Sequence, residues 1–249
     1  MDRDVIENFK KEFAKIKSKG FIPSNRIHDT GIGKTFEDLM NIAENNIKEA
    51  DYKGVLELKS KRELSGSMLT LFTKSPTFPK KINTNLREKY GKPHENHPDC
   101  KVLHTTVSGA KFNTFIDKYG FKLEVDRQLQ RINLNVKELS SGEIIEKDVY
   151  YSFDDLTNII NKKCKNIAVI YADSKKENGT EFFSFTKAIL MTGLAIDKFL
   201  KLIEEGIILY DIRLGVYGTG KNKGKTHDHG SGFRVHKKDL NKVFDIEEI

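Results

Sequence analysis

The sequence has few cysteines and no long apolar segment. Its two cysteines, Cys100 and Cys164, lie far apart and do not form the disulfide framework of a small secreted domain. No run approaches the roughly 20 apolar residues that a membrane span requires, and the charged start Met-Asp-Arg-Asp is unlike a secretory signal. Internal repeats and low-complexity linkers are also absent. We therefore expect a soluble, cytoplasmic protein.

The charge balance is basic. The chain has 43 Lys and Arg residues against 36 Asp and Glu, a formal net charge of +7. This excess favours a polyanion such as nucleic acid as the large partner, although many basic proteins have no such partner. A length of 249 residues is enough for one large domain or two closely joined ones.

Apolar residues recur with both helical and strand periods, which predicts a mixed α/β fold. A first helix is expected to end before Gly20, and a second to begin near Thr35, where Thr35 and Asp38 can form a capping box. Further helices are predicted at 153–162 and 196–203, and strands at 55–59, 69–76, 121–125, 132–136, 149–152, 167–171 and 182–185.

The stretch from Asp51 to Lys59 brings two carboxylates and a lysine together. If 55–59 is a strand, Glu57 and Lys59 share one face while Leu56 and Leu58 enter a sheet. Asp51 then approaches from the preceding turn. Two carboxylates and the backbone carbonyl of Leu58 suit a hard cation such as Mg²⁺ and leave room for water and a phosphate oxygen. Lys59 can orient or help deprotonate that water. The alternative is an ordinary solvated strand edge.

Glu37 is a candidate accessory carboxylate. It lies about 100° around the predicted helix from the apolar Phe36, so it can face the stretch from Asp51 to Lys59. The alternative is an exposed glutamate in the first turn, which the helix dipole favours.

Basic residues crowd the segment from Lys59 to Lys92 and include Lys61 and Lys74. Beside a carboxylate site, such a segment suits the phosphate backbone of DNA, with salt-sensitive affinity that is independent of sequence. A solvated basic face is the alternative.

The C-terminal part carries polar side chains that suit the reading of bases. Asp211, Arg213 and Tyr217 alternate along one predicted strand, a Gly/Lys loop follows, and Arg234 lies on a second strand. Arg donates two hydrogen bonds to guanine, and Asp accepts one from cytosine. The expected DNA-binding residues here are Asp211, Arg213, Tyr217, Lys225, His227, His229 and Arg234.

Two other motifs are considered. The row His94, His97, Cys100 and His104 has spacings that suggest zinc, but structural zinc sites use two close ligand pairs and this row lies in a proline-containing segment. The glycines near Lys225 and Lys34 do not have the Walker A spacing, which argues against an NTPase.

Several motifs occur together along the chain: Thr30–Leu39, Asp51 with Glu57-Leu58-Lys59, Leu69–Pro76, Thr106–Gly109, and Gly224–Gly230 with Phe233-Arg234. Asp51, Glu57 and Lys59 match the PD-(D/E)xK nuclease pattern, with Ala50 in place of the proline. Together the motifs resemble the MvaI/BcnI restriction endonuclease family, which is similar in fold to the nicking endonuclease MutH.

The resemblance implies a PD-(D/E)xK core of MutH-like type, with a central mixed sheet flanked by helices, and a β-rich recognition lobe. The expected division is a catalytic lobe at 1–110 and a recognition lobe at 111–249, with the reading strands and loop at 211–236. The two lobes would grip double-stranded DNA from opposite grooves in a monomer.

The resemblance also implies residue roles and a reaction. Asp51 and Glu57 would bind Mg²⁺, Lys59 would be the catalytic lysine and Glu37 an accessory acid. Because the separation of the two carboxylates varies in the family, Asp51 is less secure, and Asp38 is its competitor. The activity would be type II cleavage at a CC-N-GG site such as CCWGG, leaving 5′-phosphate and 3′-hydroxyl ends, with a DNA methyltransferase as genetic partner. The alternatives are a MutH-like repair nicking enzyme and a non-catalytic DNA-binding regulator.

Overall fold

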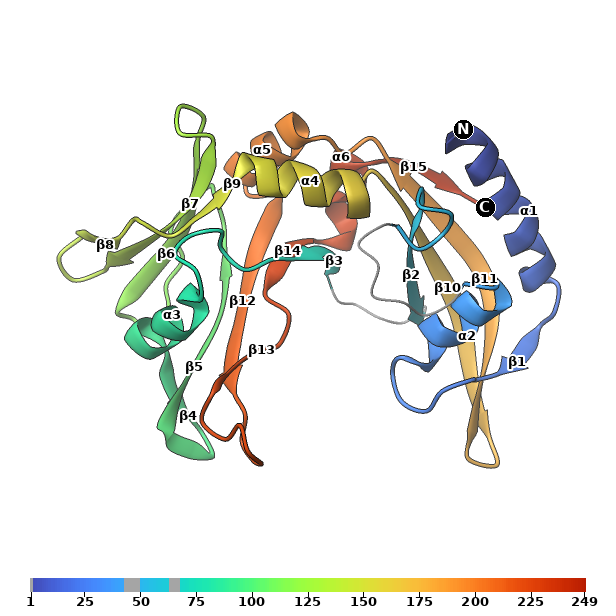
Figure 1. Cartoon of the computed structure of the whole chain (residues 1–249), viewed down its shortest axis with the longest axis horizontal. Helices are drawn as coiled ribbons and strands as arrows, with labels where there is room; N and C mark the ends of the chain where they lie inside the picture. The colour runs from blue at the N-terminus through green and yellow to red at the C-terminus, as the bar shows by residue number, and fades with distance from the viewer. Residues whose placement is uncertain (1, 43–49, 63–67) are drawn as a thin grey trace. The chain divides into compact units, whose positions relative to one another are not determined.

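The computed structural model describes residues 2–42, 50–62 and 68–249, which belong to two compact units (Figure 1). Unit 1 comprises Met1–Ser67, Ile160–Leu194 and Leu240–Ile249, and unit 2 comprises Met68–Ile159 and Ala195–Asp239. These bounds do not follow the expected division at residue 110. The reason is strand pairing, because β2 (Glu57–Arg62) pairs in parallel with the distant β10 (Asn166–Glu177).

Unit 1 is built on one sheet with helices packed against it. The sheet has the order β1-β11-β10-β2, with β15 also paired to β11, and β2 and β10 form its parallel pair. The other elements of this unit are α1 (Asp2–Lys17), α2 (Gly31–Leu39), α6 (Leu240–Val243), β1 (Phe21–Pro23), β11 (Thr180–Thr192) and β15 (Asp245–Glu248).

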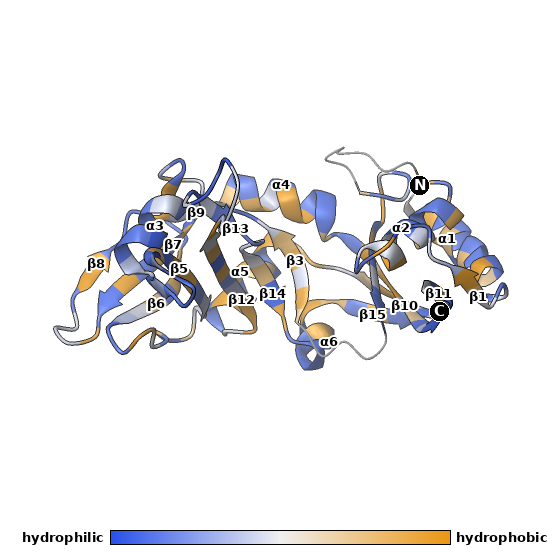
Figure 2. Cartoon of the chain, turned by 90° about the horizontal axis from the view of Figure 1, so that it is seen from below, coloured by the Kyte–Doolittle hydropathy of each residue, from blue (hydrophilic) through white to orange (hydrophobic). Residues whose placement is uncertain are grey.

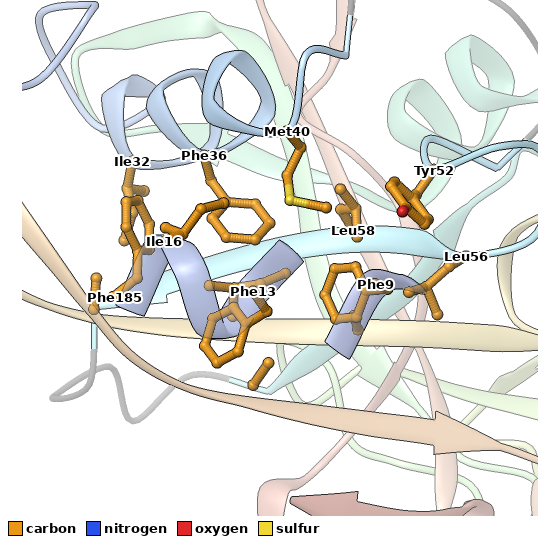
Figure 3. Packing of buried hydrophobic residues seen from close by; sticks show 14 of the residues in the cluster. Phe9, Phe13, Ile16, Ile32, Phe36, Met40, Tyr52, Leu56, Leu58 and Phe185 are labelled. Carbon is orange, nitrogen blue, oxygen red and sulfur yellow. The ribbon is translucent and has the colours of Figure 1, made fainter. Parts of the chain in front are cut away.

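The core of unit 1 fixes the position of β2. Phe9 and Phe13 of α1 and Phe36 of α2 meet Leu56 and Leu58, which all have less than a tenth of their surface exposed (Figure 3). Leu56 and Leu58 point into this core, so the alternating residues Glu57 and Lys59 lie on the other face of the strand. The predicted alternation is therefore confirmed, although the strand runs from Glu57 to Arg62 rather than over 55–59.

The predicted start of the second helix at Thr35 is wrong. The helix α2 begins four residues earlier, at Gly31, and Thr35 is completely buried inside it. The Thr35 hydroxyl accepts a hydrogen bond from the backbone N–H of Asn25, at 2.9 Å, instead of capping the helix. Burial of Ile32 one turn before Phe36 explains the longer helix, since the two lie on one apolar face.

Unit 2 contains two sheets. One has the order β3-β14-β12-β5-β4 with β13 paired to β12, and the other has the order β6-β7-β8 with β9 paired to β7. The strands are β3 (Leu69–Thr73), β4 (Lys92–His94), β5 (His97–Val107), β6 (Tyr119–Asp126), β7 (Arg131–Glu138), β8 (Ile144–Glu146), β9 (Tyr150–Ser152), β12 (Ile208–Val216), β13 (Thr226–Asp228) and β14 (Gly232–Val235).

The helices of unit 2 cover these sheets. They are α3 (Ile82–Tyr90), α4 (Phe153–Lys163), whose residues from Ile160 belong to unit 1, α5 (Ile196–Glu204) and the short 3₁₀ helix η1 (Lys237–Asp239). Aromatic contacts around Phe233 join β14 to Phe72 and Phe199, with ring centroids 5.2 and 5.1 Å apart. The predicted hairpin at 121–136 and the helices near 153 and 196 are confirmed.

The helices carry both hydrophobic and hydrophilic residues, as α1 and α4 show in Figure 2. In the described part of the chain, no helix is long and apolar enough to cross a membrane.

Candidate active site and DNA-recognition surface

A tight turn brings Asp51 alongside β2. Tyr52 and Leu56 form an antiparallel bridge, and Lys53 and Gly54 between them both have left-handed backbone conformations, with φ of 52° and 67°. The chain therefore reverses directly after Asp51, whose Oδ2 accepts a hydrogen bond from the backbone N–H of Leu58 at 3.0 Å. The expected approach of Asp51 from the preceding turn is confirmed.

Glu57 is the buried member of the pair. Its side chain is 12% exposed, against 31% for Asp51. Burial raises the pKa of Glu57, and the nearby charge of Asp51 raises it further, while Lys163 and Lys59 act in the opposite direction. Lys59 Nζ lies 4.0 Å from Glu57 Oε1. The structure thus brings Asp51, Glu57 and Lys59 together.

Lys163, which sequence reasoning missed, completes this cluster. It is the last residue of α4, and its Nζ donates a hydrogen bond to Glu57 Oε2 at 2.8 Å and lies 4.0 Å from Asp51 Oδ1. Near it, Asn166 Nδ2 donates to the carbonyl of Val55 at 3.2 Å. No local pattern in the sequence marks this contact, because it depends on the pairing of β10, which follows α4, with the distant β2.

The donor set of the cluster fits a hard divalent cation. Asp51 and Glu57 provide carboxylate oxygens, the ligand type that Mg²⁺ prefers. In a strand, the N–H and C=O of one residue point to the same side. Because the N–H of Leu58 faces Asp51, its carbonyl also faces that side and not β10. Within 2–42, 50–62 and 68–249, no group of three or more His, Cys, Asp and Glu side chains is arranged for a metal.

The remaining acidic candidates lie on α2. Glu37 is partly exposed on this helix, which packs next to β2, and its accessory role stays a prediction. Asp38 is engaged elsewhere, with Lys34 and with Asn25 Nδ2 at 2.8 Å. These hydrogen bonds, that of Lys34 first, lower the pKa of Asp38. Asp38 therefore competes poorly with Asp51 as a site residue. Lys61 is partly exposed, two positions after Lys59 on β2.

In unit 2, the strand β12 holds two of the residues predicted to contact bases, Asp211 and Arg213. Asp211 Oδ2 lies 3.2 Å from Arg234 Nε and 4.0 Å from Arg213 Nε, and Asp211 Oδ1 accepts a hydrogen bond from Thr106 at 3.0 Å. The Arg213 side chain is 47% exposed, while that of Arg234 is only 13% exposed. Arg234 also donates hydrogen bonds to the Thr70 hydroxyl and the Gly230 carbonyl, so Arg213 is the better placed of the two to reach a ligand.

Aromatic and imidazole rings form a continuous row beside these charges. Tyr217 stacks on His227 at 4.3 Å between centroids, and His227 lies 4.2 Å from His229. His229 packs over Gly215, where an added Cβ would lie 2.7 Å from Nε2. His104, which sequence reasoning considered only for zinc, lies 6.1 Å from His229 and opposite Arg213 in the register of β5 and β12.

Burial, together with the neighbouring His229 and Arg213 charges, lowers the pKa of His104. Burial and the neighbouring His227 and Arg213 likewise lower the pKa of His229. Both rings are therefore neutral near pH 7, and each can donate one hydrogen bond and accept another.

The helix α3 anchors β13, the strand that carries His227. The buried Arg87 donates from Nε to the Thr226 hydroxyl at 3.1 Å and from Nη1 to the carbonyl of Lys101 at 2.8 Å. One turn earlier, Asn83 Nδ2 donates to Asp228 Oδ2 at 3.0 Å. Both neighbours of His227 in the chain are therefore fixed by α3.

The predicted DNA-binding residues Lys74 and Lys225 have different surroundings. Lys74 is paired with Asp155 at 2.9 Å, and Lys225 lies exposed in the Gly/Lys loop, where Nζ donates to Asn222 at 3.2 Å. His94, His97 and Cys100 lie in the β4 and β5 hairpin rather than in an irregular loop. Nothing in the described residues of this hairpin gathers them into a metal-binding group.

Comparison with known proteins identifies the family of this chain. The model of the MvaI/BcnI restriction endonuclease family matches residues 10–244. The chain belongs to the MvaI/BcnI restriction endonuclease family. It is therefore a restriction endonuclease, an enzyme that hydrolyses DNA.

Two solved structures are similar over nearly the full length. The complex of the restriction endonuclease MvaI with its cognate DNA substrate has 40% sequence identity and a TM-score of 0.82, covering 97% of each chain. MvaI in the absence of DNA has 38% identity and a TM-score of 0.61, covering 96% of this chain and 95% of that one. A search among curated proteins found no match.

Proposed function

We propose that this protein is a type II restriction endonuclease that cleaves both strands of double-stranded DNA at a short pseudopalindromic site of the CC-N-GG type, such as CCWGG. Hydrolysis depends on Mg²⁺ and leaves 5′-phosphate and 3′-hydroxyl ends. The observation that carries this proposal is the cluster of Asp51, Glu57 and Lys59 on one hairpin, in a chain with the fold of an enzyme solved with its cognate DNA.

In this proposal, unit 1 performs the chemistry on a PD-(D/E)xK core of MutH-like type. Asp51, Glu57 and the Leu58 carbonyl would hold Mg²⁺, which would supply charge stabilisation at the scissile phosphate and a more acidic water. Lys59 lies on the same face of β2 as Glu57, from which it can orient the attacking water in line with the leaving oxygen. Burial of Glu57 limits access of bulk water and so strengthens electrostatic interactions in the cluster. Glu37 acts as an accessory acid.

Unit 2 selects the sequence. The exposed Arg213 guanidinium can donate two hydrogen bonds to guanine, and Asp211, which Thr106 and Arg234 hold in place, can accept one from cytosine. The imidazole nitrogens of His227 and His229 can hydrogen bond to bases beside them. Lys61, Lys74 and Lys225 contribute charge towards the phosphate backbone.

Digestion of a sequenced plasmid with the purified protein tests the proposal. With Mg²⁺ the expected product is linear DNA, whose mapped ends share one CC-N-GG site and carry 5′-phosphates; with EDTA no cutting occurs. A persistent nick that requires a partner protein would favour the MutH-like alternative, and protection of DNA without cutting would favour a regulator. The Glu57→Gln variant is the matched control for contaminating nuclease.

We further propose that the protein acts as a monomer and is paired genetically with a DNA methyltransferase. Sedimentation of the protein with a single-site duplex tests the first point, with one chain per duplex as the expected result. Methylation of the mapped site by the enzyme from an adjacent reading frame, followed by resistance to cutting, tests the second.

A further inference from the structure

We propose that Lys163 is a resident cation of the active site: its ammonium group occupies the position between Asp51 and Glu57 that a divalent metal must take, and the metal binds by displacing it. This inference rests on the metal site of the proposed function and adds a competitor for the same oxygens.

The four oxygens of the Asp51 and Glu57 carboxylates have different neighbours. Asp51 Oδ2 accepts the hydrogen bond from the N–H of Leu58, which leaves Oδ1 on the side of Lys163. Glu57 Oε1 lies towards Lys59, and Oε2 accepts the hydrogen bond from Lys163. Lys163 therefore faces one oxygen of each carboxylate, Asp51 Oδ1 and Glu57 Oε2, so a cation that contacted both of these atoms would compete with it.

Charge explains why a cation is needed there. Two carboxylates at short range, one of them mostly buried, repel each other and lose solvation. Lys59 lies 4.0 Å from Glu57 and hydrogen bonds to neither carboxylate, so it compensates this repulsion less than Lys163, at 2.8 Å, does. Lys163 offsets part of this repulsion, and its hydrogen bond holds the Glu57 carboxylate in place before metal binds.

The position of Lys163 also permits its displacement. It is the last residue of α4, where the carbonyl end of a helix stabilises a positive charge. Its side chain is 26% exposed and has four flexible methylene groups, so the ammonium can leave the carboxylates without loss of solvation. Mg²⁺ and Lys163 cannot both contact Oδ1 and Oε2 at bonding distance, because a metal would lie about 2.1 Å from each oxygen.

The test is the affinity of the DNA-free, full-length protein for Mn²⁺, measured by calorimetry at about pH 8, where carboxylates are charged. The Lys163→Met variant removes the competing charge and keeps much of the side-chain length. We expect it to bind Mn²⁺ at least about tenfold more tightly than the wild type, since one nearby positive charge is lost. The Lys163→Arg variant keeps the charge and is expected to retain the wild-type affinity.

Lys162→Met is the matched control, because Lys162 is the exposed neighbour on the same helix. It is expected to leave Mn²⁺ affinity unchanged. Thermal denaturation of each variant, monitored by circular dichroism, checks that the variant is folded when its Mn²⁺ affinity is measured. Equal or weaker binding by a folded Lys163→Met variant would overturn the inference.

The result separates this inference from the proposed function. If the wild type cuts plasmid DNA with Mg²⁺ and Lys163→Met gains no affinity, the competition is disproved while the nuclease site stands. If Asp51→Asn leaves Mn²⁺ binding unchanged, the metal binds elsewhere and the proposed site itself fails.

Discussion

The proposed active-site cluster of unit 1 and the proposed recognition surface of unit 2 are built in different ways. Asp51, Glu57 and Lys59 come from one hairpin, and only Lys163 comes from elsewhere in the sequence. The predicted recognition side chains come instead from β5, β12, β13, β14 and the segments beside them, and α3 anchors β13. The first region depends on charges packed into a small volume, and the second on strands held in register. Substitutions in unit 1 should therefore reduce cleavage, whereas substitutions in unit 2 should reduce discrimination between DNA sequences.

The largest expected effect is in the active site. Asp51→Asn removes one of two carboxylate charges, and we expect cleavage to fall at least about 100-fold at every site, with specific DNA binding kept. Single-turnover cleavage and binding in Ca²⁺ measure the two quantities. Asp38→Asn is the matched control, since Asp38 binds Lys34 and Asn25 instead. A greater loss of cleavage in Asp38→Asn than in Asp51→Asn would mean that Asp38 of α2 is the metal ligand.

The next effect concerns specificity. Arg213→Ala should cost about 1–3 kcal/mol of discrimination at one base pair. Lys225→Ala should instead weaken binding to all sequences and lower the salt dependence by about one charge. Competition binding with cognate, single-mismatch and random duplexes distinguishes them. Equal weakening by Arg213→Ala on all three duplexes would mean that this residue only holds phosphate.

A smaller effect is expected from the anchor between α3 and β13. Thr226→Val removes the hydroxyl that accepts from Arg87, and the buried Nε of Arg87 loses that partner. Stability to urea should fall by about 1–3 kcal/mol, and discrimination should fall while cleavage of the remaining bound cognate DNA continues. Thr70→Val, which removes a partner of Arg234 on β3, is the comparison variant. Unchanged discrimination with Thr226→Val would limit α3 to a purely structural role.

The smallest effect is a pH dependence of stability. Burial raises the pKa of Glu57, so the folded state binds that proton more tightly than the unfolded state. Stability from this group is therefore fully present below the unfolded pKa and is lost as the pH rises through the folded pKa. In EDTA, Glu57→Gln should gain in Tm relative to the wild type as the pH rises from about 4 to 8. A constant difference across this range would contradict the raised pKa.

The difference between the regions also explains what the sequence predicts. Asp51, Glu57 and Lys59 could be found because strand alternation and a short turn fix their geometry locally. Lys163 could not, because its contact depends on the parallel pairing of β2 with β10, more than 100 residues away. The same pairing makes unit 1 discontinuous, which a single division at residue 110 does not anticipate.

The recognition surface was predicted in composition but not in detail. Alternation placed Asp211 and Arg213 on one face, and the structure brings them to Arg234. The alternation does not show that Arg234 hydrogen bonds to Thr70 and Gly230. The position of His104 beside His229 depends on the register of β5 against β12, which local spacing does not encode.

The central claim is that the Asp51, Glu57 and Lys59 cluster hydrolyses DNA that unit 2 has selected. Lys59→Ala tests it most directly, with cleavage of a cognate duplex in Mg²⁺ and binding of the same duplex measured side by side. The account predicts that cleavage is lost and that preference for the cognate sequence remains. Cleavage by Lys59→Ala at the wild-type rate would contradict it.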